Sequence, residues 1–165
     1  MSESKQNESN EILEKLEAVI RHIENVKDNC ILLGKRLIEE EGEFDLGKQL
    51  IANSYIHDNS KFYGIEWEFL GEQGGRSKLD LAVSQHNKTN PHHPEYWGNI
   101  TEMPRVFLAE MACDWKARSE EFGTSIRDWI DDGAAKRFGY KKNDRVYKEI
   151  MYFVDLLCEK PFKQK

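Results

Sequence analysis

The chain has 165 residues, a length that suits one domain and allows a substantial hydrophobic core. Its 30 Asp and Glu residues outnumber its 24 Lys and Arg residues, which gives a formal net charge of -6 at pH 7. A general nucleic-acid binder is normally basic, so this balance argues against extended nucleic acid as a partner.

The cysteines and the apolar runs indicate the compartment. Cys30, Cys113 and Cys158 lie far apart and form no CxxC pair, which favours a reducing compartment and argues against a zinc–thiolate site. No apolar run approaches ~20 residues, the length that a membrane span needs. Residues 1–10 are polar and contain no apolar signal core. We therefore expect a cytoplasmic protein with no membrane partner.

Apolar residues recur at helical spacing along the chain, and no segment alternates with a period of two. The first predicted helix spans 11–41, with Ser9 or Asn10 as its cap. Further helices are predicted over 45–58, 64–70, 77–87, 101–122, 124–138 and from 143 or 144 to 158. Residues 89–99 contain Pro91 and Pro94 and are predicted to form a loop. The pattern predicts an all-α fold of about six to seven helices, a single domain over 1–165 with flexible tails at 1–10 and 161–165.

Histidines and aspartates supply the candidate site. The segment His57-Asp58-Asn59-Ser60-Lys61 pairs an imidazole with a carboxylate, and the other candidates are His22, His86, His92, His93 and Asp114. Neutral imidazole and carboxylate are ligands for zinc, iron, manganese and similar ions. These seven residues, with His57 and Asp58 at their centre, are the predicted metal ligands.

Helical phase places three of these groups on buried faces. His57 lies seven residues after Leu50, His86 seven after Leu79, and Asp114 seven after Phe107. A spacing of seven places both residues of each pair on one helix face. His22 lies at the edge of its apolar stripe. A buried carboxylate is costly unless it is paired or bound to a metal, so three inward-facing polar groups need a common partner. A cation would satisfy all three.

Simpler explanations exist for the single residues. A lone buried histidine is usually a hydrogen-bonded core residue, and Asp114 could pair with Lys116 or Arg118 on its own helix. Glu110 shares a face with Asp114 and could support a ligand, although a solvated carboxylate is an equal alternative. Tyr96 and Trp97 could line a pocket mouth or pack over a helix end. The residues taken together favour a metal site.

The order His, His-Asp, Asp resembles the metal signature of the HD phosphohydrolase superfamily. On this resemblance His22 corresponds to the first histidine, His57 and Asp58 to the doublet, and Asp114 to the late aspartate. The doublet segment is also similar to the His-Asp-x-Gly-Lys form of the branch that cleaves cyclic dinucleotides, with Ser60 in place of glycine. His92-His93-Pro94-Glu95 resembles the His-His-Glu of that branch. The resemblance implies a compact helical bundle that holds one or two metal ions.

Two ions can be accommodated by this number of ligands. His22, His57, Asp58 and Asp114 would hold the first, and Asp58 would bridge to a second held by His86 and either His92 or His93. The expected cofactors are one or two divalent transition metal ions, namely Mn, Fe, Co or Zn. Two cations would acidify a bridging water and turn it into a nucleophile near neutral pH.

The predicted reaction is the hydrolysis of a phosphate ester, in a nucleotide or cyclic nucleotide. Asp58 and Lys61 are the predicted catalytic residues, and Lys61 would stabilise developing negative charge. The predicted phosphate contacts are Lys61, Lys88, Arg118 and Arg127. The expected partner is thus a small phosphorylated substrate, with a homodimer left open.

Two other classes fit the same residues. HD-fold di-iron oxygenases use four histidines and two carboxylates to cleave C–C or C–P bonds with dioxygen, and ligand types alone do not separate iron from manganese or zinc. The third class is a metal-stabilised protein that binds a nucleotide without turnover. An open coordination position favours catalysis, and a closed shell favours a structural role.

Overall fold

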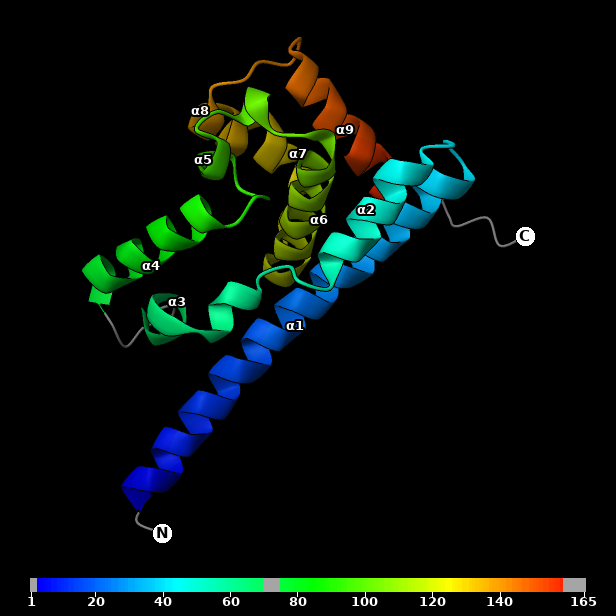
Figure 1. Cartoon of the computed structure of the whole chain (residues 1–165). Coiled ribbons are helices and arrows are strands. Elements are labelled where there is room, and N and C mark those ends of the chain that lie inside the picture. The colour runs from blue at the N-terminus through cyan, green and yellow to red at the C-terminus, as the bar shows by residue number, and fades with distance from the viewer. Residues whose placement is uncertain (1–2, 70–74, 159–165) are drawn as a thin grey trace.

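A computed structural model describes residues 3–69 and 75–158 of the chain (Figure 1). The described residues form helices and connecting turns without a strand, which confirms the all-α fold. The longer helices are α1 (Glu3–Glu39), α2 (Phe44–Ser54), α4 (Gly75–Thr89), α6 (Arg105–Phe122) and α9 (Arg145–Cys158). The shorter elements are η1 (Asn59–Phe62), α3 (Gly64–Phe69), α5 (Pro94–Trp97), η3 (Ile100–Glu102), α7 (Ile126–Asp128), η4 (Trp129–Ala134) and α8 (Ala135–Phe138).

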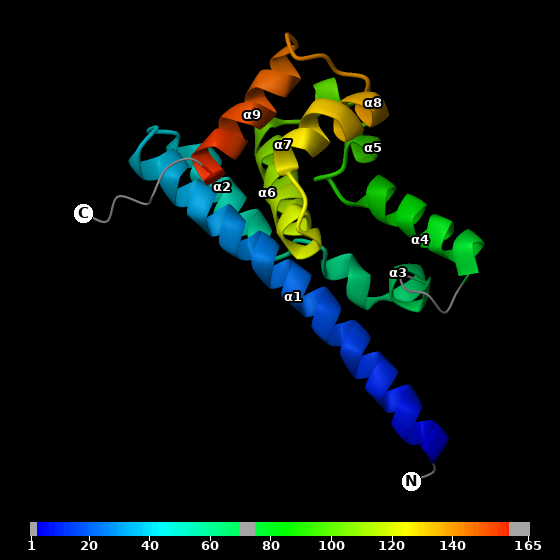
Figure 2. The ribbon, with the colours of Figure 1, turned by 180° about the vertical axis from the view of Figure 1, so that it is seen from behind.

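Helix α1 has two halves with different surroundings. Its C-terminal half lies beside α2, α6 and α9, whereas its N-terminal half extends away from these helices (Figures 1 and 2). The helix begins at Glu3, so the predicted cap at Ser9 or Asn10 is wrong, and residues 3–10 are helical. The residues before Ser9 include Glu, Lys and Gln, which favour helix, so nothing in the sequence ends the helix there.

Two glycines allow α2 to lie directly against α1. A Cβ atom on Gly47 would lie 2.4 Å from the carbonyl oxygen of Gly34, and a Cβ atom on Gly34 would lie 2.5 Å from Ile51 Cγ1. Larger side chains would therefore force the two backbones apart. This close approach fixes the C-terminal end of α2, from which the His57-Asp58 doublet follows.

The hydrophobic core lies between α1, α6 and α9. It contains Val26, Cys30, Leu33 and Leu37 from α1, Leu108, Ala109, Met111, Ala112 and Cys113 from α6, and Ile150, Phe153 and Val154 from α9. The residues of α1 in this list recur every three or four positions, so they form one face of the helix. Helix α6 is buried around most of its circumference, which places its polar side chains inside the molecule as well.

The region predicted as one helix over 124–138 is divided. A π-helical segment, η4, separates α7 from α8, and the ring of Trp129 packs directly over Gly133, where a Cβ atom would lie 2.3 Å from Trp129 Cε3. The predicted loop at 89–99 contains the one-turn helix α5, which begins at Pro94 because proline suits the first turn of a helix. Leu70, the predicted end of the third helix, and the tail at 161–165 lie outside the described residues.

No helix within residues 3–69 and 75–158 is long and apolar enough to cross a membrane.

Candidate metal centre

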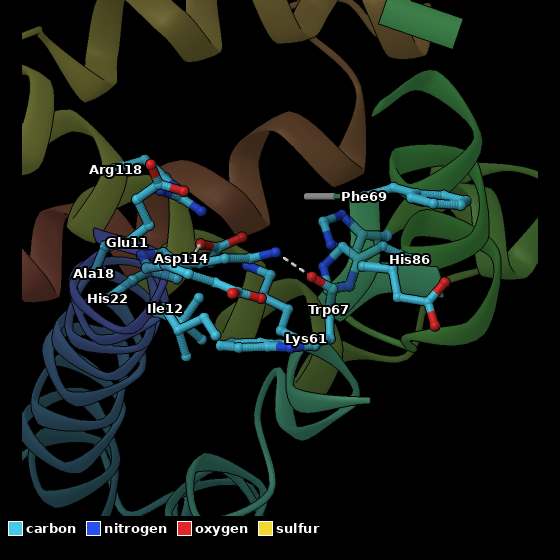
Figure 3. A pocket seen from close by; sticks show the side chains of 15 residues that line it. Glu11, Ile12, Ala18, His22, Lys61, Trp67, Phe69, His86, Asp114 and Arg118 are labelled. Atoms are coloured by element: carbon cyan, nitrogen blue, oxygen red, sulfur yellow. Dashed lines mark hydrogen bonds and ion pairs between the residues drawn. The ribbon is translucent and has the colours of Figure 1, made fainter. Parts of the chain in front are cut away.

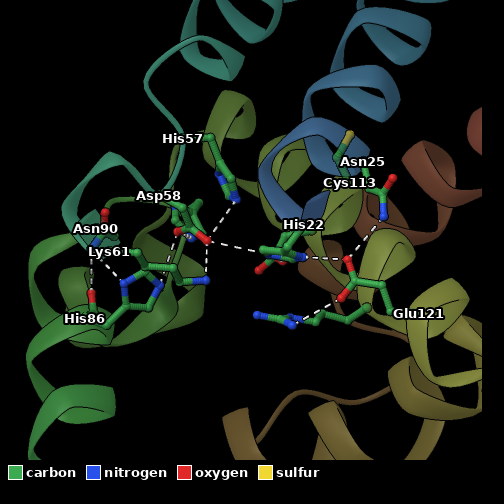
Figure 4. Close-up of polar contacts among 12 residues, drawn as sticks. His22, Asn25, His57, Asp58, Lys61, His86, Asn90, Cys113 and Glu121 are labelled. Carbon is green, nitrogen blue, oxygen red and sulfur yellow. Dashed lines mark hydrogen bonds and ion pairs between the residues drawn. The ribbon is translucent and has the colours of Figure 1, made fainter. Parts of the chain in front are cut away.

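Five parts of the chain bring the predicted ligands together. They are α1, the turn after α2, the end of α4, the segment before α5, and the middle of α6. Figure 4 shows His22, His57, Asp58 and His86 pointing toward one another. We call the set His22, His57, Asp58, His86, His92, His93 and Asp114 the ligand cluster. Apart from His93, which is half-buried, its members are no more than 7% exposed.

The doublet reaches the cluster through a tight turn and not through a helix. Helix α2 ends at Ser54, four residues earlier than predicted, so the helical-phase argument for His57 is wrong although His57 is buried. Asp58 has φ 56°, the one positive value at a non-glycine position in the part of the chain that the structure describes. Aspartate tolerates this left-handed conformation better than most residues do. The turn aims the Asp58 carboxylate inward and continues into η1, which carries Lys61.

The imidazole Nε2 atoms converge on the two aspartates. The Nε2 atom of His22 lies 3.1 Å from Asp114 Oδ1. Those of His86 and His92 lie 3.2 and 3.3 Å from Asp58 Oδ1. The Nε2 atoms of His22 and His57 both lie 3.5 Å from Asp58 Oδ2. The two oxygens of Asp58 therefore face different histidines.

The opposite nitrogens of three rings contact glutamates. The Nδ1 atoms of His22 and His57 lie 2.9 Å from carboxylate oxygens of Glu121 and Glu110, respectively. His86 Nδ1 lies 2.7 Å from Glu66. Because a carboxylate only accepts hydrogen bonds, each Nδ1 carries a proton, and Nε2 of the neutral ring presents a lone pair. Carboxylates in this position orient metal-binding histidines in many metalloproteins.

Sequence reasoning missed two of these glutamates. Glu121 lies seven residues after Asp114 on α6, so helical spacing could have placed both on one face. Glu66 lies on α3, and no periodic pattern connects it to His86. Glu110 is 4% exposed and also accepts a hydrogen bond from Asn53, so the solvated alternative for Glu110 is wrong.

The cluster contains buried acceptors that face one another. Its buried side-chain atoms without a hydrogen bond are Nε2 of His22, His57, His92 and His93, both oxygens of Asp58, and Oδ1 of Asp114; of these, Asp58 Oδ2 forms an ion pair with Lys61 Nζ. Burying such atoms without partners is costly, and lone pairs on opposite groups cannot satisfy each other. A cation satisfies imidazole and carboxylate lone pairs together. The donor set therefore fits a metal ion.

The carboxylates of the cluster favour positive charge at its centre, whether on a protonated imidazole or on a bound ion. Burial raises the pKa of Asp58, but His57 and Lys61 outweigh it and hold that pKa well below its usual range. Burial and the neighbouring His92 lower the pKa of His93 to about 2, so this ring is neutral. Burial lowers the pKa of His22, but the carboxylates of Asp114 and Asp58 outweigh it and raise the pKa to about 9. A metal ion would displace the proton that these carboxylates otherwise attract to His22.

The ligand atoms form two groups that meet at Asp58. Asp58, His86, His92 and His93 offer atoms within 4.8 Å of one another, and so do His22, His57 and Asp114. These buried groups could hold a metal ion. The sequence had left open whether His92 or His93 is a ligand of the second ion. The structure places both in the first group, so either or both could serve. A third combination, His57, His92 and Glu110, overlaps both groups.

A cavity of 1020 Å³ opens onto the cluster (Figure 3). Its inner end is lined by His22, His86, His93, Asp114, Lys61 and Arg118. Lys61 is 8% exposed and its Nζ contacts the Asp58 carboxylate. Arg118 is paired with Glu121, at 3.1 Å, on the same helix.

Other predicted phosphate contacts lie elsewhere. Lys88 is exposed on α4, and Arg127 pairs with Asp155 at 2.8 Å; neither lines the described cavity wall. The structure therefore does not bring these two residues to the ligand cluster, because charge alone does not fix the direction of a side chain. Trp97 donates a hydrogen bond to Pro91 O and packs against Phe107, which matches the packing alternative for Trp97 and not the pocket mouth.

Comparison with known proteins places the chain in a family without assigning it an activity. No curated protein and no solved structure matches the chain. A family model matches residues 11–160, which include every member of the ligand cluster and all of α6. The chain belongs to the family of unknown function DUF5662.

Proposed function

We propose that the protein is a metal-dependent hydrolase of phosphate esters. The observation that carries this proposal is a pair of ligand groups that both face Asp58 and open onto a cavity whose inner end carries the cationic side chains of Lys61 and Arg118. A purely structural metal site has no need of an adjoining cavity, whereas a catalytic site must admit a substrate and water. The order of the ligands, which resembles that of the HD superfamily, supports the same reaction class.

The proposed reaction exchanges one P–O bond for another. The oxygen of a water molecule forms a new bond to phosphorus, the bond from phosphorus to the alcohol oxygen breaks, and a proton from the water ends on the alcohol. A divalent ion held at the cluster would acidify the water and neutralise phosphate oxygens.

Lys61 has an electrostatic role in this proposal. Its ammonium group lines the cavity and contacts Asp58, so it lies beside the place where a phosphate would meet the ligand cluster. It can donate hydrogen bonds to a phosphate oxygen on which negative charge develops. Arg118 lies on the same inner wall and offers a second positive charge, although part of that charge is offset by Glu121.

Replacement of Lys61 tests the proposal. In Lys61→Ala we expect unchanged metal content and turnover of a phosphate ester lowered by ~10²-fold or more, the range seen when one preorganised donor is removed. Lys88→Ala is the matched control, because Lys88 is exposed outside the cavity, and it should keep full turnover. Full turnover in Lys61→Ala on the best ester found would contradict the role given to Lys61.

A second candidate is an oxygenase. His22, His57 and Asp114 form a set of two histidines and one carboxylate, the ligand type of many non-haem iron oxygenases. The two candidates differ in a direct measurement. The hydrolase releases phosphate with several divalent ions and consumes no oxygen, whereas an oxygenase would require iron and consume dioxygen in proportion to product. Binding of phosphate esters without either reaction would contradict both and favour a metal-stabilised binding protein.

A further inference from the structure

The cavity extends from the ligand cluster along one face of α1. The residues of α1 that line it are Glu8, Glu11, Ile12, Lys15, Ala18, Val19 and His22. They recur every three or four positions and therefore share one face of the helix. From His22 toward the N-terminus, this face presents the apolar Val19 and Ala18, then Lys15 and Ile12, and finally the acidic Glu11 and Glu8.

The position of each zone follows from helix geometry. An α-helix rises about 1.5 Å per residue, so along the axis Val19 lies roughly 4.5 Å from His22, Ile12 roughly 15 Å and Glu8 roughly 21 Å. An organic group attached to a phosphate at the cluster would thus first meet Ala18 and Val19. A group that extended beyond Ile12 would reach the acidic end of the cavity, which is formed by Glu8, Glu11 and Glu68.

The opposite wall of the cavity is aromatic. Trp67 and Phe69 of α3 line it, and Glu68 lies between them (Figure 3). Lys15 crosses from α1 to this wall, where its Nζ donates to Trp67 O and lies 4.7 Å from the centre of the Trp67 ring. This contact engages the Lys15 ammonium group and keeps α1 and α3 together across the cavity.

Buried atoms without partners point to a ligand at the inner end. His22 Nε2 and Asp114 Oδ1 lie 3.1 Å apart and form no other hydrogen bond, their residues are 3% and 7% exposed, and both residues line the cavity. The ligand therefore combines a group that meets a cation at this end with a body that fits an apolar and aromatic passage.

We propose that the cavity binds phosphate monoesters of an aromatic or aliphatic alcohol, with the body between Val19 and Trp67. This inference rests on the proposed function and adds the substrate class. Burial of the body between the two walls would contribute affinity in proportion to its apolar area. A second phosphate at the far end of the body is disfavoured, because Glu8 and Glu68 would repel it.

Binding of phosphonates tests the cavity without any turnover, because their P–C bond is not a substrate for hydrolysis. Calorimetry on the Mn²⁺-loaded protein should give phenylphosphonate a Kd about tenfold lower than that of methylphosphonate, owing to the buried ring. With 1,4-phenylenebisphosphonate the Kd should be at least about threefold higher than with phenylphosphonate, because of the acidic end. Equal affinities for the phenyl and methyl compounds would overturn the inference.

A matched pair of variants locates the apolar wall. Val19 lines the cavity, while the adjacent Ile20 does not line it and is 39% exposed. Val19→Ser should weaken phenylphosphonate about threefold and leave methylphosphonate unchanged, whereas Ile20→Ser should alter neither. Manganese content is measured for both, so that a change at the ligand cluster is recognised. Equal effects of the two substitutions on phenylphosphonate would contradict the assigned wall.

A hydrolysis assay separates this inference from the function on which it rests. Benzyl phosphate should be cleaved with kcat/KM about tenfold above glycerol 1-phosphate, whose leaving alcohol is similarly basic and whose body is small and polar. If no ester is cleaved while the phosphonates bind in the expected order, the hydrolase proposal fails and the assigned cavity specificity stands. If both esters are cleaved with equal kcat/KM, the hydrolase stands and the substrate class is wrong.

Discussion

The ligand cluster and the hydrophobic core occupy adjacent turns of the same two helices. On α1, His22 belongs to the cluster and Val26, one turn later, is fully buried in the core. On α6, Met111 is in the core and Asp114 is in the cluster. The core side chains are satisfied by contact with each other, whereas the cluster atoms face other acceptors. Equally buried residues therefore fall into two classes: the core residues pack against one another, and the cluster residues offer atoms that could hold a metal ion.

Asp58→Asn should have the largest effect, because it should abolish metal binding at the ligand cluster while the hydrophobic core stays intact. It removes the charge that both ligand groups share, while asparagine tolerates the left-handed backbone that alanine would strain. We expect metal binding to be lost. In the parent protein, Mn²⁺ at 100 times its Kd should stabilise the fold by about 2.7 kcal/mol, and a chelator should reverse this.

Thermal denaturation with and without Mn²⁺ measures this effect. The melting temperature of Asp58→Asn should not respond to the ion or to the chelator. A variant that kept both the bound metal and the melting shift would show that Asp58 is not the shared ligand.

Leu33→Ala tests the core side of the comparison. Leu33 is fully buried on α1, and removal of its side chain should lower the free energy of unfolding by about 2–5 kcal/mol. Metal content should stay at the parent value, because Leu33 belongs to the hydrophobic core and is not a member of the ligand cluster. Urea denaturation measures the free energy of unfolding. The control is Leu13→Ala, because the Leu13 side chain is 54% exposed and its removal should change that free energy little. Loss of metal from folded Leu33→Ala would mean that the two regions are not separable.

The glutamates behind the histidines divide the cluster into halves. Of the cluster histidines, Glu66 contacts His86, and it also accepts a hydrogen bond from Ser60, whereas Glu110 contacts His57 and lies 3.6 Å from His92 Nδ1. Loss of such a carboxylate typically lowers metal affinity ~10- to 100-fold. Glu66→Gln should weaken one binding step in a Mn²⁺ titration, and Glu110→Gln should weaken both. Identical titrations for the two variants would contradict the division at Asp58.

The smallest expected effect lies far from both regions. Arg105 and Tyr152 hold the pKa of Glu43 below its usual range, so this carboxylate stabilises the fold above its ordinary pKa of 4.5 and loses that contribution as the pH falls below it. Glu43 is partly exposed, which limits the contribution to under about 1 kcal/mol.

Urea midpoints at pH 7 and pH 3.5 should therefore differ slightly less in Glu43→Gln than in the parent. Metal-free protein is used for both, so that cluster protonation is the same in each. A larger loss of stability on acidification in the variant would reverse the assigned sign.

The sequence predicted the helices and the cluster members better than the geometry that joins them. Helical spacing identified the inward side of Asp114 and the buried part of the α1 stripe at Cys30, Leu33 and Leu37, because both depend on a repeating pattern, but Leu13 and Ile20 of the same stripe are exposed. It misplaced the end of α2, since the left-handed turn at Asp58 is set by tertiary contacts that pattern does not record. Glu66 had no signal, because a single glutamate on a six-residue helix has no periodicity to reveal its contact with His86.

Metal content tests the central claim most directly. Elemental analysis of the purified protein, repeated after incubation with Mn²⁺, Fe²⁺, Co²⁺ or Zn²⁺ and removal of free ion, should give between one and two ions per chain. We expect this value because the imidazole and carboxylate atoms around Asp58 form two buried groups, each with enough ligand atoms for one ion. Less than about a tenth of an ion per chain after every incubation would contradict it.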